Sequence, residues 1–171
     1  MREHQREAFA AAVLEVHPLP VDLRERHAAQ PGTVASVGFI DRVALLNIRA
    51  GEVLTARSTG NNVFYLPGGK REPGESDVDT LRREVMEELG VTVRVESAQR
   101  FGVFEAQAHG FPPGVLVRTA CYTAEFAGEP VPQGEIAELR WIGPTGRDLL
   151  SVADGLIMDE LVASGLMWSR P

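Results

Sequence analysis

Apolar and polar residues change their spacing several times along the chain, and these changes predict its elements. Runs rich in β-branched and apolar residues predict strands at 34–46, 53–57, 64–66, 91–95, 101–108, 115–126 and 137–142. Residues 77–89 are predicted to form a helix because apolar residues recur at helical spacing, at Val78, Leu81, Val85 and Leu89. Ser76 and Gly90 suit the two ends of this helix. A second helix, weakened by Gly155, is predicted over 151–164. Strands mixed with two main helices indicate an α/β fold whose sheet is covered on both faces.

The first 32 residues have a different pattern from the rest of the chain. Residues 3–16 have helical composition, and a proline-rich stretch at 17–20 interrupts them. The first firm break is Pro31-Gly32. We therefore predict an N-terminal extension over 1–32, packed on the main domain or on a partner subunit, and one domain over 33–171.

The composition of the chain argues against several classes of binding partner. The net charge is −7, from 17 basic and 24 acidic residues, and this argues against a duplex nucleic acid as the partner. The apolar runs are too short to cross a bilayer, so no membrane partner is expected. Cys121 is the single cysteine, which rules out an internal disulfide, and the polar N-terminus does not resemble a secretory signal. The expected location is the cytoplasm.

Residues able to carry chemistry are concentrated between Gly69 and Val91. Glu84, Glu87 and Glu88 are spaced i, i+3 and i+4, so their carboxylates share one face of the predicted helix. Like charges at this spacing repel each other in a bare helix. A hard divalent cation among the oxygens turns this repulsion into binding, and Mg²⁺ and Mn²⁺ prefer such ligands.

The spacing of the whole segment is more specific than the acidic face alone. Gly69 is followed by five residues, then Glu75, then seven residues, and then the run REVMEELGV from Arg83 to Val91. This pattern resembles the Nudix box at every specified position. The box covers 23 residues, and the order of strands and helices extends the resemblance over roughly 33–165. The resemblance implies a mixed sheet sandwiched between helices (α/β/α). It also implies hydrolysis of a nucleoside diphosphate linked to another group, X, with Mg²⁺ (or Mn²⁺).

The resemblance also implies a role for each residue of the box. Arg83 is expected to hold a catalytic carboxylate in orientation, and Glu75 to stabilise the loop and assist the base. The expected metal ligands are the carbonyl of Gly68 and the carboxylates of Glu84, Glu87 and Glu88.

The general base and the substrate contacts are less sharply defined. Glu84 is the first choice for the base, but several family members use a glutamate in the loop before the last strand, which makes Glu135 and Glu138 candidates. Lys70 and Arg57 are candidates for substrate binding, although Lys70 also fits a solvated loop. His109 fits either a pocket or an exposed loop. The aromatic residues available to stack a base are Phe39, Phe64, Phe104 and Trp141.

The identity of X is predicted by elimination. Signatures that mark the hydrolases of ADP-ribose, dinucleoside polyphosphates and NADH are missing outside the box. This leaves the MutT-like class, which acts on nucleoside triphosphates. Hydrolysis of ADP-ribose, an NDP-sugar or a dinucleoside polyphosphate is the alternative, and a non-catalytic nucleotide-binding regulator is another. Such regulators usually lose box carboxylates, whereas this chain keeps them. A small-molecule nucleotide is the expected partner, and a homodimer is compatible with the family.

Overall fold

The structure is a computed structural model, and it describes residues 39–168 of the chain. The predicted extension over 1–32, with its helix at 3–16, lies outside these residues, and so does the part of the first predicted strand that precedes Phe39. Among the described residues, no helix is both long and apolar enough to cross a membrane.

The strands form three sheets, of which the largest is mixed. It has the order β4-β1-β7-β6, with β1 parallel to β7 and the other pairs antiparallel. A three-stranded antiparallel sheet has the order β2-β3-β9, and β5 pairs with β8. The strands are β1 (Phe39–Leu46), β2 (Ile48–Arg49), β3 (Glu52–Ser58), β4 (Gly68–Lys70), β5 (Thr92–Val93), β6 (Gln99–Gln107), β7 (Leu116–Thr123), β8 (Phe126–Ala127) and β9 (Ile136–Ile142).

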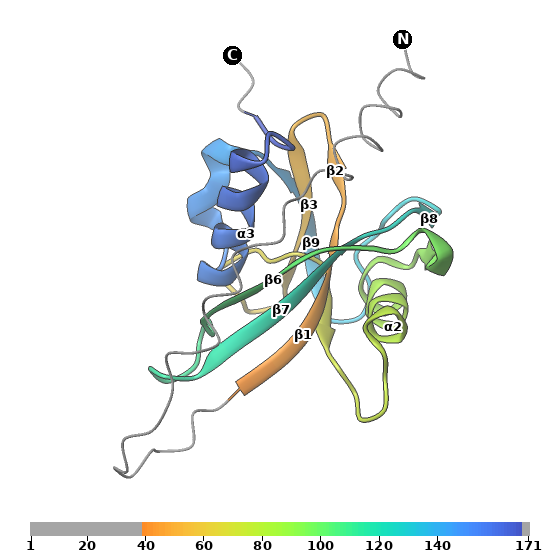
Figure 1. The fold of residues 1–171 in the computed structure, drawn as a ribbon, viewed down its shortest axis with the longest axis horizontal. Coiled ribbons are helices and arrows are strands. Elements are labelled where there is room, and N and C mark those ends of the chain that lie inside the picture. The colour runs from red at the N-terminus through yellow and green to blue at the C-terminus, as the bar shows by residue number, and fades with distance from the viewer. Residues whose placement is uncertain (1–38, 169–171) are drawn as a thin grey trace. The chain divides into compact units, whose positions relative to one another are not determined.

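Two α-helices cover opposite faces of these strands, α2 (Asp77–Leu89) and α3 (Val152–Ala163) (Figure 1). The alternation of side chains along β1 explains the arrangement. Val43 and Leu45 are buried in the cluster that contains the apolar residues of α2. Ala44 and Leu46 are buried in the cluster that contains those of α3. Both faces of β1 are therefore core, and the helix–sheet–helix architecture predicted from the sequence is confirmed.

The helix α2 begins and ends where the sequence predicts. The Ser76 side chain accepts a hydrogen bond from the Asp79 amide, and the Asp79 carboxylate accepts one from the Ser76 amide, which completes a capping box. At the other end Gly90 adopts a φ of 65°, the left-handed conformation that closes helices. Leu81, Val85 and Leu89 are fully buried, whereas Val78 is half-buried.

The strand predicted at 64–66 is wrong, because this segment makes only isolated bridges, Tyr65 to Ala56 and Phe64 to Leu150. The strand beside β1 is β4, formed by Gly68–Lys70, which begins two residues after Leu66. The reason is steric. Gly68 has a φ of 135°, and a Cβ there would lie 2.1 Å from the Val43 carbonyl oxygen. Glycine alone permits this close approach. The strand predicted over 91–95 is also shorter, because β5 ends at Val93 and a 3₁₀ turn follows at Val95–Ser97.

Candidate active site

A cavity of about 820 Å³ has one strongly acidic end. There the backbone of Gly68 and Gly69 faces the C-terminal half of α2. Four carboxylates line this end, those of Glu84, Glu87, Glu88 and Glu135. The structure thus brings the three predicted metal ligands on α2 together with one of the two loop glutamates.

The two glycines allow the backbone of β4 to contact the carboxylates directly. A Cβ on Gly69 would lie 2.3–2.4 Å from the carboxylate atoms of Glu84, so any side chain there would displace that group. The Gly68 amide donates a hydrogen bond of 2.7 Å to Glu88 Oε2. Gly68 and Gly69 therefore shape the acidic end through the absence of side chains.

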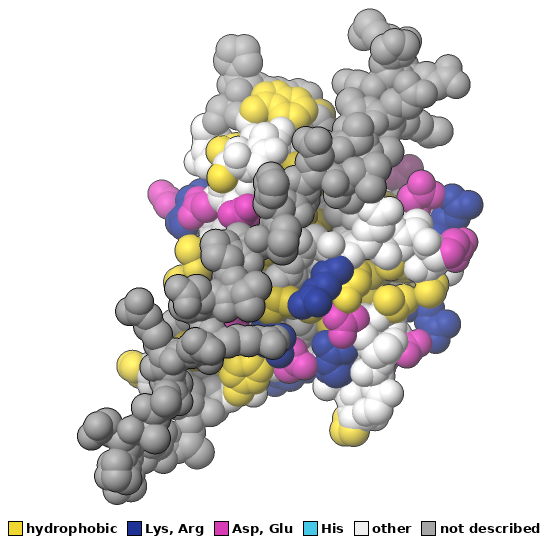
Figure 2. Space-filling view, in the orientation of Figure 1, with side chains coloured by type: hydrophobic (Ala, Val, Ile, Leu, Met, Phe, Trp, Pro, Cys, Tyr) yellow, Lys and Arg dark blue, Asp and Glu magenta, His cyan; other side chains and the backbone are white. Residues whose placement is uncertain are grey.

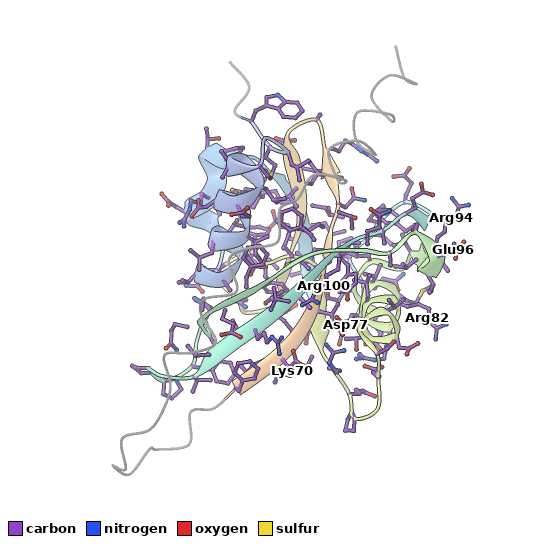
Figure 3. All side chains as sticks on the ribbon, in the orientation of Figure 1. Lys70, Asp77, Arg82, Arg94, Glu96 and Arg100 are labelled. Carbon is purple, nitrogen blue, oxygen red and sulfur yellow. The ribbon has the colours of Figure 1, made fainter. Side chains whose placement is uncertain are left out.

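Arg83 connects the loop before α2 to two of the acidic residues. Its Nε and Nη2 donate to the two oxygens of Glu75 at 2.7 and 2.8 Å. Its Nη1 donates to Glu84 Oε1 at 2.7 Å and to Glu87 Oε2 at 3.4 Å. Its neighbour Arg82 is exposed and points away from the strands (Figure 3). Arg83 thus makes the contacts that a positioning role requires, and that role stays a prediction.

Both carboxylate oxygens of Glu75 accept hydrogen bonds from neighbouring residues. Hydrogen bonds from Arg83 lower the pKa of Glu75 to about 2, with further donation from the Glu72 amide and the Thr80 hydroxyl. Because the group stays ionised at neutral pH and both its oxygens are engaged, its contacts support the loop-stabilising part of the predicted role.

Glu88 has the opposite environment. Its side chain is only 6% exposed, and burial raises the pKa of Glu88 to about 7, helped by the nearby charges of Glu84 and Glu135. The Gly68 amide and the Arg42 charge act against this rise. A cation bound nearby would stabilise the ionised form of such a buried acid among like charges.

The chemistry of these donor groups fits a divalent cation, but their oxygens are not arranged around a single point. Within residues 39–168, no three acidic, histidine or cysteine side chains are gathered as metal ligands. Instead Glu84 and Glu87 contact Arg83, and Glu88 contacts the Gly68 amide. Carboxylate oxygens in one cavity are the hard donors that Mg²⁺ and Mn²⁺ prefer.

The loop before β9 reaches the acidic end because it caps α2. The amides of Val131 and Gln133 donate to the carbonyls of Leu89 and Glu88, two of the groups that a helix leaves unpaired at its C-terminus. Ser58 Oγ then donates to Glu135 Oε1 at 3.1 Å and also contacts the Tyr65 hydroxyl. Glu135 therefore lines the cavity while its side chain stays exposed.

Glu138 lies elsewhere, so the structure separates the two loop candidates. Its carboxylate pairs with Arg57 at 2.6 Å and with Arg140, and these contacts lower the pKa of Glu138. Neither Glu138 nor Arg57 lines the cavity, whereas Lys70 and His109 do. The contact of Arg57 with this region is indirect, through a hydrogen bond of 3.2 Å to the Asn61 carbonyl.

The aromatic residues chosen from the sequence are not those at the cavity. Phe64 is buried beneath Arg57 and Arg140, Phe104 stacks on Phe101, and Trp141 lies under Arg49. Phe39 is exposed but does not line the cavity. Phe111 does, and the sequence analysis did not select it because it lies in a loop dense in glycine and proline.

Arg42 is a second residue that the sequence analysis missed. Its Nη2 donates to the carbonyls of Leu66 at 2.6 Å and Gly68 at 3.2 Å. Its Nη1 lies 3.8 Å from the buried Asp154 of α3, whose Oδ1 accepts from the Leu66 amide at 3.1 Å. The available signal was a charged pair, Asp41 and Arg42, within a strand whose other residues are apolar. This Arg42–Asp154 link supports the glycine segment from the side of α3.

A model of the NUDIX domain family matches residues 39–150, which is more than half of the chain. The chain belongs to the Nudix hydrolase family. This confirms the family and the class of hydrolase predicted from the sequence. Nudix hydrolases act on small-molecule nucleotides and generally use a divalent metal.

Curated relatives of this Nudix hydrolase include NAD-capped RNA hydrolases named NudC. The protein of Pseudomonas fluorescens Pf-5 is 34% identical over 126 residues, which cover 71% of this chain and 39% of that relative. That of Pseudomonas putida W619 is 34% identical over 141 residues, covering 76% and 45%. The chain therefore spans less than half the length of these relatives.

Solved structures of other Nudix proteins share the fold. The Escherichia coli ORF135 protein has a TM-score of 0.61 at 25% identity, over 77% of this chain and 94% of that one. The MutT protein of Methanosarcina mazei Go1 has a TM-score of 0.64 at 20% identity, over 77% and 99%, and this likeness concerns the fold alone.

Proposed function

We propose that this Nudix hydrolase cleaves a phosphoanhydride bond in a nucleoside diphosphate linked to X, with Mg²⁺ (or Mn²⁺) as its cofactor. The observation that carries the proposal is the acidic end of the cavity. Glu84, Glu87, Glu88 and Glu135 line it, and Arg83 is bonded to two of them. These carboxylates repel one another, so they suit the binding of a cation. A bound cation in turn suits a negatively charged phosphate substrate.

In this proposal the cation is held by the three carboxylates of α2 and the carbonyl of Gly68. That carbonyl already accepts from Arg42 at 3.2 Å, but a carbonyl oxygen has a second lone pair for another partner. When bound, the cation neutralises charge on the phosphates and acidifies a bound water. The protein's own part is to fix the carboxylates, and Arg83 and the Gly69 backbone do so for Glu84.

Glu84 remains our first choice for the general base, and Glu135 is the alternative. Arg83 holds Oε1 of Glu84, which leaves Oε2 to take a proton from water. Ser58 likewise holds one oxygen of Glu135. Glu75 is excluded from this role in the proposal because its low pKa makes it a poor proton acceptor at neutral pH.

Two substrate classes enter the proposal. Nucleoside triphosphates are favoured by the missing signatures of other subfamilies. The similarity to NAD-capped RNA hydrolases favours a pyrophosphate bond of the NAD type instead. On the part of the face that is visible in Figure 2, basic side chains lie among acidic ones, and the net charge of the chain is −7. We therefore keep small nucleotides first. A cytoplasmic location and a homodimer are proposed on sequence grounds alone.

A substrate panel tests the proposal with the full chain. Nucleoside triphosphates, oxidised dGTP, ADP-ribose, NAD⁺, dinucleoside polyphosphates and a short NAD-capped RNA are assayed with Mg²⁺ and with Mn²⁺. We expect phosphoanhydride cleavage that EDTA abolishes. The triphosphate assignment is wrong if NAD⁺, NAD-capped RNA or an NDP-sugar has the highest kcat/KM. The reaction class itself is wrong if no anhydride is cleaved with either metal.

A further inference from the structure

The end of the cavity away from the carboxylates is apolar. Ile40 of β1 and Val117 of β7 are register partners in the parallel pair and line it side by side. Ala108 lines it next to them, together with the exposed Phe111 and His109. The loop that joins β6 to β7 and the beginning of β1 lie at the same end of the four-stranded sheet (Figure 1). Topology thus brings apolar side chains from three segments to one place.

The Gln107 side chain holds the β6–β7 loop in shape. Its Oε1 accepts from the Gly114 amide at 2.9 Å, and its Nε2 lies at 3.0–3.4 Å from three loop carbonyls, those of Ala108, Phe111 and Pro112. His109 Nε2 lies 3.1 Å from Asn62 Oδ1, which ties the loop to the segment before β4. These bonds fix the backbone on both sides of Phe111, which lines the cavity, so little ordering of the loop backbone is left to occur on binding.

The two ends lie at a distance that suits one substrate. Ala44 pairs with Gly68 at the acidic end, and Ile40 lies four residues earlier on β1. At strand spacing this separation is about 13 Å. A nucleoside diphosphate has comparable reach from its phosphates to its base.

We propose that this apolar end, the ring subsite, binds a planar aromatic ring of the substrate stacked on Phe111. The inference rests on the proposed function, because it supplies the second half of the same substrate. A nucleobase and a nicotinamide share the chemistry that the subsite recognises, a flat π-face with polar edges. Ile40 and Val117 provide an apolar floor for such a ring, and His109 provides a polar group at its edge.

The test compares two ligands that differ in the ring. The α,β-methylene analogue of ADP carries a ring and resists hydrolysis, and methylenediphosphonate carries neither ring nor ribose. Calorimetry with the full chain and Mg²⁺ measures both dissociation constants for the wild type, Phe111→Ala, Phe111→Tyr and Phe39→Ala. Phe39 is a matched control, since it is 51% exposed against 49% for Phe111 and does not line the cavity.

We expect Phe111→Ala to weaken binding of the ADP analogue by roughly 5- to 100-fold, as for loss of a base-stacking residue, without changing binding of methylenediphosphonate. Phe111→Tyr and Phe39→Ala should bind both ligands like the wild type. The ring subsite is wrong if Phe111→Ala weakens both ligands equally or neither, or if the wild type does not prefer the ADP analogue. Because no bond is cleaved, a positive result stands even if the hydrolysis assay fails, and a negative one leaves the reaction class intact.

Discussion

The two ends of the cavity are built by different physical means. Charge organises the acidic end, where Arg83 is bonded to Glu75, Glu84 and Glu87. The ring subsite has no such network, and the amide of Gln107 organises it through bonds to the loop backbone. From this contrast we infer that the two ends of the cavity have different tasks, turnover at one end and substrate binding at the other. Changes at the acidic end should act on turnover, and changes at the ring subsite should act on substrate binding.

The largest expected effect comes from removing one carboxylate of the acidic end. We expect Glu87→Gln to lower kcat by about 10²- to 10³-fold, because the proposed cation loses several kcal/mol of its ability to stabilise the transition state. Steady-state kinetics on the best substrate measure it. Glu96→Gln is the control, since Glu96 does not line the cavity and lies beside Arg94 (Figure 3). An unchanged kcat in Glu87→Gln contradicts the metal role.

The second prediction uses pH to probe the acidic end without substrate. In EDTA, the folded-state pKa of Glu88, about 7, lies above its ordinary value of 4.5. The unfolded chain therefore ionises first, and stability is full below about pH 4.5 and falls as pH rises through 7. At about 1.4 kcal/mol per pH unit, the loss is on the order of 3 kcal/mol.

Urea midpoints across this range measure the loss. Glu88→Gln should flatten this part of the pH profile, since a neutral amide has nothing to ionise. Adding Mg²⁺ at about pH 8 should stabilise the wild type more than the variant, because a ligand that binds the folded state stabilises it. Equal slopes in the two proteins would show that another group is responsible.

Arg83 should have the third largest effect. Arg83→Ala should lower kcat/KM by about 10- to 100-fold, the range for groups that orient metal ligands. Arg83→Lys should not restore activity, because one ammonium cannot reproduce the paired bonds to Glu75 and the bond to Glu84. Arg82→Ala removes the exposed neighbour on the same helix and should be silent. Equal losses in Arg82→Ala and Arg83→Ala would refute the positioning role.

The smallest expected effect comes from a change at the ring subsite. Gln107→Ala should raise KM about 3- to 10-fold with kcat nearly unchanged, because Phe111 must then be ordered on binding. Its effect should be absent with inorganic triphosphate, which lacks a ring. A fall in kcat with an unchanged KM would show that the loop acts on the chemistry instead.

The same contrast explains how far the sequence predicts the structure. The bounds of α2 and its three carboxylates follow from local signals, the Ser76 cap, the Gly90 terminator and the helical spacing. Glu135 was predictable only as one of two loop candidates, because its choice depends on how that loop caps α2. Phe111 was not predictable, since its position follows from the pairing of β6 with β7 and from Gln107. The strand at Gly68–Lys70 was missed for a similar reason, a tertiary contact with Val43.

The Arg42–Asp154 link makes α3 a reporter of events on the far side of the sheet. Leu66 donates its amide to Asp154, and its carbonyl accepts from Arg42, which also bonds the Gly68 carbonyl. That amide can exchange its hydrogen with solvent only when the link opens. A cation that tightens the glycine segment should therefore slow deuterium uptake at Leu66 and carry the protection into the first turn of α3. Deuterium uptake in α3, a helix that contributes no carboxylate to the acidic end, would then report whether a cation is bound there.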